Sequence, residues 1–96
     1  MDLYIFAHFH ASAGNEAAVA GLLREQTEGV RKESGCLAIH AYCSIRDPRL
    51  FYIHSRWTGE AAFERHAELP RTVQFVERME ALIDHPFDAT RAWPLV

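Results

Sequence analysis

Histidine and tyrosine alternate with other residues in two apolar stretches of this sequence. One stretch contains His40 and Tyr42, and the next contains Tyr52 and His54. Alternate residues of a β-strand point to the same face, so each pair shares a face if both stretches are strands. An imidazole titrates near neutral pH and can act as a general base, while a phenol can donate a hydrogen bond to a developing oxyanion. The pattern predicts a site for proton abstraction.

The two stretches flank residues 45–49, which include the turn-forming pair Asp-Pro. A hairpin that brackets this loop symmetrically pairs His40 with His54 and Tyr42 with Tyr52. Directly opposed residues have Cβ atoms roughly 5 Å apart, close enough to share a proton or a ligand. We therefore predict that His40 and His54 are catalytic and that Tyr42 and Tyr52 contact the substrate. The alternative is that all four pack as aromatic pairs in a dimer interface.

The first apolar stretch places further aromatic and imidazole groups on the same face. Tyr4, His8 and His10 follow the same alternation, and we predict that Tyr4 and His8 contact the substrate. Four imidazoles on one face could hold zinc or copper. Because no carboxylate or cysteine joins them at a ligand spacing, we predict no metal site, and a metal-binding dimer is kept as an alternative.

Hydrophobic spacing and turn signals place these residues on a simple order of elements. Strands are expected over residues 2–11, 36–44, 50–57 and 87–93, and helices between Asn15 and Gly35, over 59–67, and from Pro70 up to His85-Pro86. Asn15 is the expected N-cap of the first helix. The order β-α-β-β-α-β predicts an α+β, ferredoxin-like antiparallel sheet with its helices on one face.

The composition describes a single domain spanning residues 1–96. The chain has a mass of 11.0 kDa, 49% hydrophobic residues and a net charge of −3, so no basic surface for nucleic acid is expected. No stretch approaches the ~20 apolar residues of a membrane span, and no signal peptide is evident. The two cysteines, seven positions apart in one predicted strand, are too distant for a disulfide. We expect a cytoplasmic protein with no membrane or nucleic-acid partner.

The two faces of the predicted sheet differ in character. One face is almost wholly apolar, including Leu37 and Cys43, and suits the helices. The other face carries the tyrosines and histidines described above and is too aromatic to be left in water. A second copy of the same sheet would cover it, with room for a small molecule between the copies. The sequence therefore predicts a homodimer.

Short motifs along almost the whole chain resemble the antibiotic biosynthesis monooxygenase (ABM) family, including its quinol monooxygenase-like members. The matching residues are Glu33-Ser34-Gly35-Cys36-Leu37, Asp47-Pro48, Phe51, Trp57, Ala61, Phe63 and His66. The resemblance implies a dimeric α+β barrel that oxidises small phenolic, quinol or polycyclic aromatic compounds with O₂ and needs no cofactor. It also implies that His66 is catalytic and that Trp57 and Arg71 contact the substrate.

Two positions depart from the family pattern, and a third differs from the haem-degrading relatives. Ser55 stands where the family often has a Glu, and Arg71 where it often has a His. The haem-degrading relatives have an Asn in the first strand where this chain has Ala7, which argues against haem. Because Ser55 and Arg71 would line the pocket, the alternative function is a non-catalytic small-molecule-binding or interaction dimer on the same fold.

Overall fold

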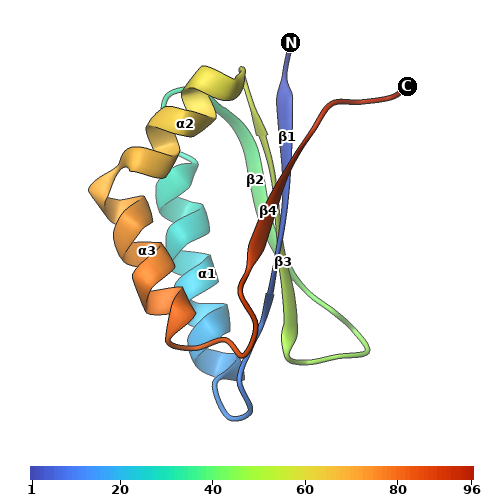
Figure 1. The fold of residues 1–96 in the computed structure, drawn as a ribbon, viewed down its shortest axis with the longest axis vertical. Helices are drawn as coiled ribbons and strands as arrows, with labels where there is room; N and C mark the ends of the chain where they lie inside the picture. Colours follow the sequence, from blue (N-terminus) through green and yellow to red (C-terminus); the bar gives the residue numbers. More distant parts are fainter.

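Four strands form one antiparallel sheet, and three helices cover one of its faces. The computed structural model describes all residues from Met1 to Val96. The elements are β1 (Leu3–His10), α1 (Glu16–Val30), β2 (Cys36–Cys43), β3 (Leu50–Trp57), α2 (Glu60–Glu68), α3 (Pro70–Glu80) and β4 (Asp88–Ala92). The strand order is β2-β3-β1-β4. Figure 1 shows all three helices on one side of the sheet and no helix on the other, which confirms the ferredoxin-like α+β prediction.

The β2–β3 hairpin has the predicted register. His40 lies opposite His54, and Tyr42 lies opposite Tyr52. A bulge between Cys36 and Ala38 interrupts the alternation at the start of β2. The prediction that Leu37 faces the helices is therefore wrong, since Leu37 lies at the bulge and is 48% exposed. Cys43 lies on the helix face as predicted, opposite the buried Phe51, although it is exposed at the end of an edge strand.

The helices depart from their predicted ends for local reasons. α1 begins directly after Asn15, but the Asn15 side chain makes no capping hydrogen bond and instead donates to the Leu82 carbonyl at 3.4 Å. α3 ends at Glu80, short of the predicted end, because Ile83 pairs with Ala11 in an isolated β-bridge. The backbone is therefore extended rather than helical at Ile83.

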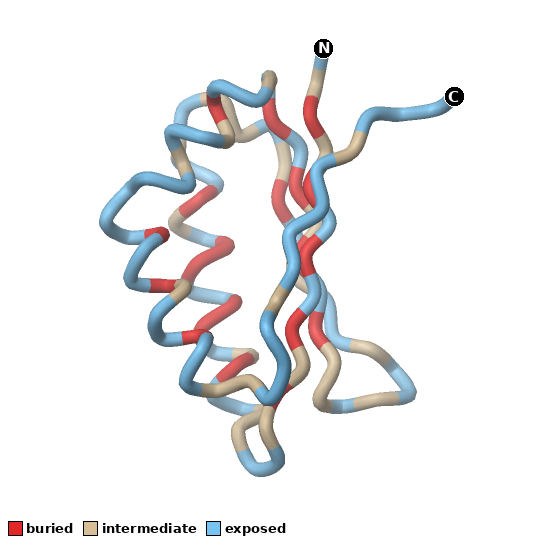
Figure 2. Tube along the Cα trace, in the orientation of Figure 1, coloured by how far each residue is buried: buried red, intermediate tan, exposed pale blue.

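The hydrophobic core lies between the sheet and the helices. Figure 2 shows the buried residues on the facing sides of the two layers, while β4 and the outer sides of the helices are exposed. The largest fully buried side chains are Trp57, Phe9, Leu3, Leu23, Met79, Val19 and Val30. Burying one such side chain contributes about 1.5–3 kcal/mol. Both cysteines are free, and none of the three helices is long and apolar enough to cross a membrane.

Candidate functional site

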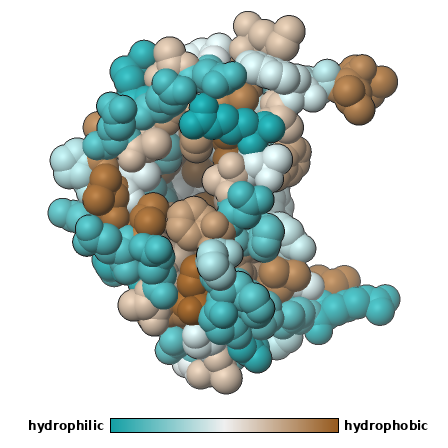
Figure 3. Space-filling view, viewed as in Figure 1, coloured by the Kyte–Doolittle hydropathy of each residue, from teal (hydrophilic) through white to brown (hydrophobic).

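A cavity of about 300 Å³ lies inside the domain, between the sheet and helices α2 and α3. In the space-filling view the surface is hollowed between the helices and β4 (Figure 3). Most of its lining is apolar. Polar groups line it at five positions: Gln26, Ser55, His66, Thr72 and Arg91. An apolar cavity with a few polar groups is the usual form of a small-molecule site.

The imidazole of His66 is the titratable group of this cavity best placed for proton transfer. His66 lies near the end of α2, and its Nδ1 is 2.8 Å from Oε1 of Glu33 in the α1–β2 loop. Both side chains are only 10% exposed. A carboxylate can only accept a hydrogen bond, so Nδ1 carries the proton and Nε2 is the basic nitrogen. Buried and oriented in this way, His66 has the form of a general base.

Trp57 forms the wall of the cavity beside His66. The two ring centroids are 4.7 Å apart, and the planes are inclined by 35°. The indole N–H of Trp57 donates to Oγ of Ser55 at 3.0 Å, with both residues buried. The serine that departs from the family pattern therefore fixes the indole. The structure thus brings Trp57 and His66 together, and their catalytic and substrate-binding roles stay predictions.

The second oxygen of Glu33 is held from α3. The Arg71 guanidinium donates to Oε2 of Glu33 at 2.6 Å, although Arg71 itself is half exposed. Arg71 is not among the residues that line the cavity. The contact seen in the structure is the one that holds the Glu33 carboxylate in place. The contact of Arg71 with the substrate stays a prediction.

A glycine lets the Glu33 loop approach α2. Gly35 has a φ of +88°, and a Cβ atom at this position would lie 2.6 Å from Cβ of Ala62. Only glycine adopts this backbone conformation without strain and leaves room for the helix. Because Gly35 lies two residues after Glu33 and packs against α2, it helps to set the carboxylate beside His66.

The other predicted site residues lie on the opposite face of the sheet. Tyr4 and Phe6 each place a ring near His54, at 6.0 and 4.8 Å between centroids. His8 lies 6.5 Å from Tyr52. This outer sheet face consists of Tyr4, Phe6, His8, His40, Tyr42, Tyr52 and His54, and none of these residues lines the cavity. The catalytic roles of His40 and His54 stay predictions that need a second site on this face.

The four imidazoles of strands β1, β2 and β3 do not form a metal-ligand cluster. The one group of three potential ligands within 4.8 Å of one another joins His10 to Asp84 and His85. The hydrogen bond to Asp84 raises the pKa of His10, and the same bond from His10 lowers the pKa of Asp84 to about 2. The His10 side chain is therefore directed toward the loop after α3. Strand alternation alone does not predict this direction.

Sequence reasoning missed Glu33 and Gln26 as residues of the site region. Glu33 begins the motif Glu33-Ser34-Gly35-Cys36-Leu37 that carries the family resemblance, so a signal was present. Gln26 lies on the buried side of α1 and lines the cavity. A single polar residue on the apolar side of a predicted helix was the available sign.

Together, these observations define a ferredoxin-like α+β domain with a mostly apolar cavity between its sheet and its helices. The family model described as antibiotic biosynthesis monooxygenase matches residues 3–78. The chain belongs to the ABM family.

Solved structures share this fold over nearly the full chain. PA3566 from Pseudomonas aeruginosa is 28% identical, with a TM-score of 0.90 and coverage of 99% of this chain and 95% of its own. Rv0793 from Mycobacterium tuberculosis is 21% identical, with a TM-score of 0.93 and coverage of 100% and 97%. An antibiotic biosynthesis monooxygenase structure is 22% identical, with a TM-score of 0.91 and coverage of 98% and 99%. No curated protein matches the chain.

Proposed function

We propose that this protein is a cofactor-independent monooxygenase that oxidises a small phenolic or quinol compound with O₂ in the cavity between the sheet and the helices. The observation that carries the proposal is the buried His66 imidazole, which lines the apolar cavity and is held by Glu33. Family membership supports the reaction class. The same fold hosts many functions, so the site rather than the fold carries the argument.

The chemistry begins with the proton of the substrate hydroxyl. Nε2 of His66 takes this proton, and the carboxylate of Glu33 stabilises the imidazolium that forms. The phenolate then gives one electron to O₂, and the resulting radical pair combines at a ring carbon to form a hydroperoxide. Loss of water leaves one oxygen atom on carbon as a quinone carbonyl, while the other leaves as water with two substrate hydrogens. Gln26 and Thr72 are among the cavity groups that can donate hydrogen bonds to the oxyanion.

The size of the cavity favours a small substrate. Its volume of about 300 Å³ lies at the lower end of the roughly 300–1,000 Å³ range of ligand pockets. An aromatic compound of one or two rings suits this volume better than a larger polycyclic one. The edge-on and inclined rings of Phe63, Trp57 and His66 form the aromatic wall against which such a compound would pack.

We further propose that the protein works as a homodimer through the outer sheet face. Phe6 and Tyr42 are each 52% exposed there, and Tyr52 is 43% exposed. A contiguous aromatic surface of this kind on one face of a sheet favours burial against a partner. The homodimer leaves the proposed cavity within each protomer.

Oxygen uptake by metal-free protein across a panel of quinols and phenols tests the proposal. We expect uptake with at least one compound and a loss on the order of 10²-fold or more in His66→Gln. His40→Gln and His54→Gln are the comparison variants, with secondary structure checked by circular dichroism. If they lose activity and His66→Gln keeps it, the reaction occurs on the outer sheet face. If wild type binds aromatic compounds, measured by quenching of tryptophan fluorescence, but consumes no oxygen, the protein is a binding dimer.

A further inference from the structure

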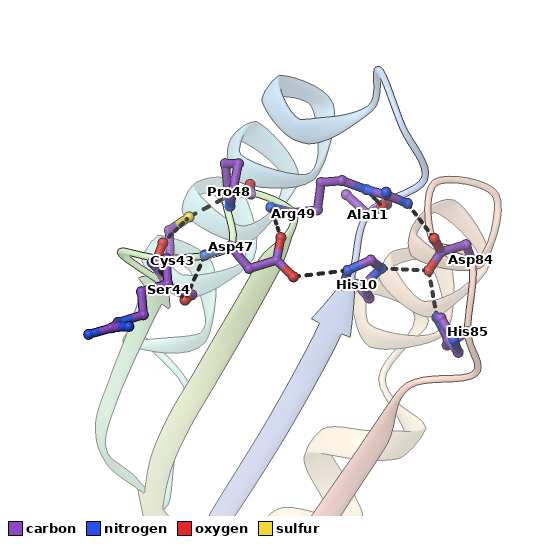
Figure 4. A network of polar contacts seen from close by, with 10 residues as sticks. His10, Ala11, Cys43, Ser44, Asp47, Pro48, Arg49, Asp84 and His85 are labelled. Carbon is purple, nitrogen blue, oxygen red and sulfur yellow. Dashed lines mark hydrogen bonds and ion pairs between the residues drawn. The ribbon is translucent and has the colours of Figure 1, made fainter.

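Three potential metal ligands meet at the end of the sheet, outside the proposed active site. Oδ1 of Asp84 lies 2.8 Å from Nδ1 of His10 and 2.6 Å from Nδ1 of His85. One carboxylate oxygen thus lies between two imidazole nitrogens, and all three ligand atoms fall within 4.8 Å of one another. Figure 4 shows the three side chains converging from β1 and from the loop after α3.

Neighbouring residues hold this cluster in the way that outer-shell residues hold metal ligands. Nε2 of His10, the nitrogen that does not face Asp84, lies 3.2 Å from Oδ2 of Asp47. The Arg49 guanidinium donates to Oδ2 of Asp84 at 2.5 Å, leaving Oδ1 directed at the two imidazoles. A carboxylate on the far nitrogen of a ligating histidine fixes its orientation and its tautomer.

A metal ion fits this arrangement after a small movement. Zinc lies about 2.0–2.2 Å from nitrogen and oxygen ligands, so neighbouring tetrahedral ligands are about 3.4 Å apart. The two distances of 2.8 and 2.6 Å would therefore each open by less than about 1 Å. The His85 side chain is 72% exposed and is free to make this movement. The ion would replace the Nδ1 protons, which leave to solvent on binding.

Room for the remaining ligands lies beside the cluster. A hollow of about 290 Å³ opens next to Asp84 and His85 and is also lined by Glu80, Ile83 and Pro86. Water, or the carboxylate of Glu80, can complete the coordination from this side. Two imidazoles and one carboxylate are ligands that suit Zn²⁺ and its neighbours in the first transition row.

We propose that His10, Asp84 and His85 form a binding site for a divalent transition-metal ion, with Zn²⁺ as the representative ion. The ion would join the end of β1 to the loop between α3 and β4. This site is separate from the His66 cavity, since none of its three ligands lines that cavity. It also differs from the outer sheet face, with which it shares only one strand.

Zinc titration of tag-free, metal-free protein by calorimetry tests the site. We expect one Zn²⁺ per chain, a higher melting temperature with zinc, and affinity weaker by at least about tenfold in His85→Gln. His8→Gln is the matched control, because His8 is an exposed histidine on the same strand β1, and its affinity should equal that of wild type. Asp84→Asn is a second variant that should weaken zinc binding. If Asp84→Asn fails to fold, His85→Gln still tests the site.

Cobalt substitution identifies the ligand atoms. The Co²⁺ form should show visible ligand-field bands and no intense near-ultraviolet thiolate band, because Cys36 and Cys43 are not part of the cluster. The proposal is overturned if wild type takes up no zinc at millimolar metal, or if His85→Gln binds as tightly as wild type. Weaker binding in His8→Gln alone would also overturn it and assign the metal to the outer sheet face.

Discussion

The carboxylate of Glu33 and the imidazole of His66 lie 2.8 Å apart with both side chains nine-tenths buried, although the two residues are 33 positions apart in the chain. Glu33 follows α1 and His66 lies near the end of α2, so the pair joins the two helical segments over the cavity. Charge-assisted hydrogen bonds of this kind are short and directional. Glu33 is thus a positioning residue for His66, and Arg71 in turn holds the other oxygen of Glu33.

Replacing Glu33 with Gln tests the positioning role. The amide oxygen can still accept from Nδ1 of His66, but the negative charge that stabilises the imidazolium is lost. We expect the turnover number to fall on the order of 10²-fold, with a smaller change in KM. A variant with wild-type turnover would rule out this role.

Ser55→Ala tests the hydrogen bond that fixes Trp57. The substitution leaves the buried indole N–H without its acceptor, because Ser55 Oγ is the one partner of Trp57 Nε1. An unsatisfied buried donor costs about 1–3 kcal/mol of unfolding free energy. Urea unfolding followed by circular dichroism measures the loss. The exposed Ser34→Ala should change stability by less than about 0.5 kcal/mol, and equal stabilities for both variants would refute the explanation.

Strand alternation and turn chemistry were enough to predict the sheet and the hairpin register. The predicted five-residue loop, residues 45–49, allows one symmetric pairing, and the structure adopts it at His40 and His54. Apolar spacing likewise predicted α1, because its buried residues recur on one side. These are local signals that a single sequence contains.

The site was harder to predict because it depends on packing between distant segments. The cavity arises where α2 and α3 pack against the sheet, and alternation along a strand does not show which face contains an empty volume. Glu33 lies in a loop, where no periodicity marks a residue as buried. The bulge near Ala38 and the turn of His10 toward Asp84 likewise depend on tertiary contacts.

Analytical ultracentrifugation tests the homodimer. We expect wild type to sediment at about twice 11.0 kDa at micromolar concentration. Phe6→Glu should shift the species to the monomer, because it places a charge in the middle of the outer sheet face. Val73→Glu is the control, since Val73 is similarly exposed, at 46% against 52% for Phe6, but lies on α3. A monomeric wild type would refute the homodimer and leave the cavity proposal intact.

The reactivity of Cys36 reports on the charge of Glu33 without any assay of turnover. Burial raises the pKa of the Cys36 thiol, and the nearby carboxylate of Glu33 raises it further. A raised thiol pKa lowers the fraction of reactive thiolate at a given pH, so Cys36 should react slowly with a disulfide reagent near neutral pH and faster as the pH rises. Cys43→Ser protein, in which Cys36 is the remaining thiol, isolates this rate.

Adding Glu33→Gln to the Cys43→Ser protein removes one of the two causes of the raised Cys36 pKa, the charge of Glu33. The reaction rate of Cys36 should then be higher than in the single variant at neutral pH. At high pH the two rates should converge, because Cys36 is ionised in both proteins. Cys36→Ser protein is the control, because exposed Cys43 should react at the same rate with Glu or Gln at position 33. An unchanged Cys36 rate in the double variant would show that the Glu33 charge does not act on its neighbours, which would also weaken its proposed effect on His66.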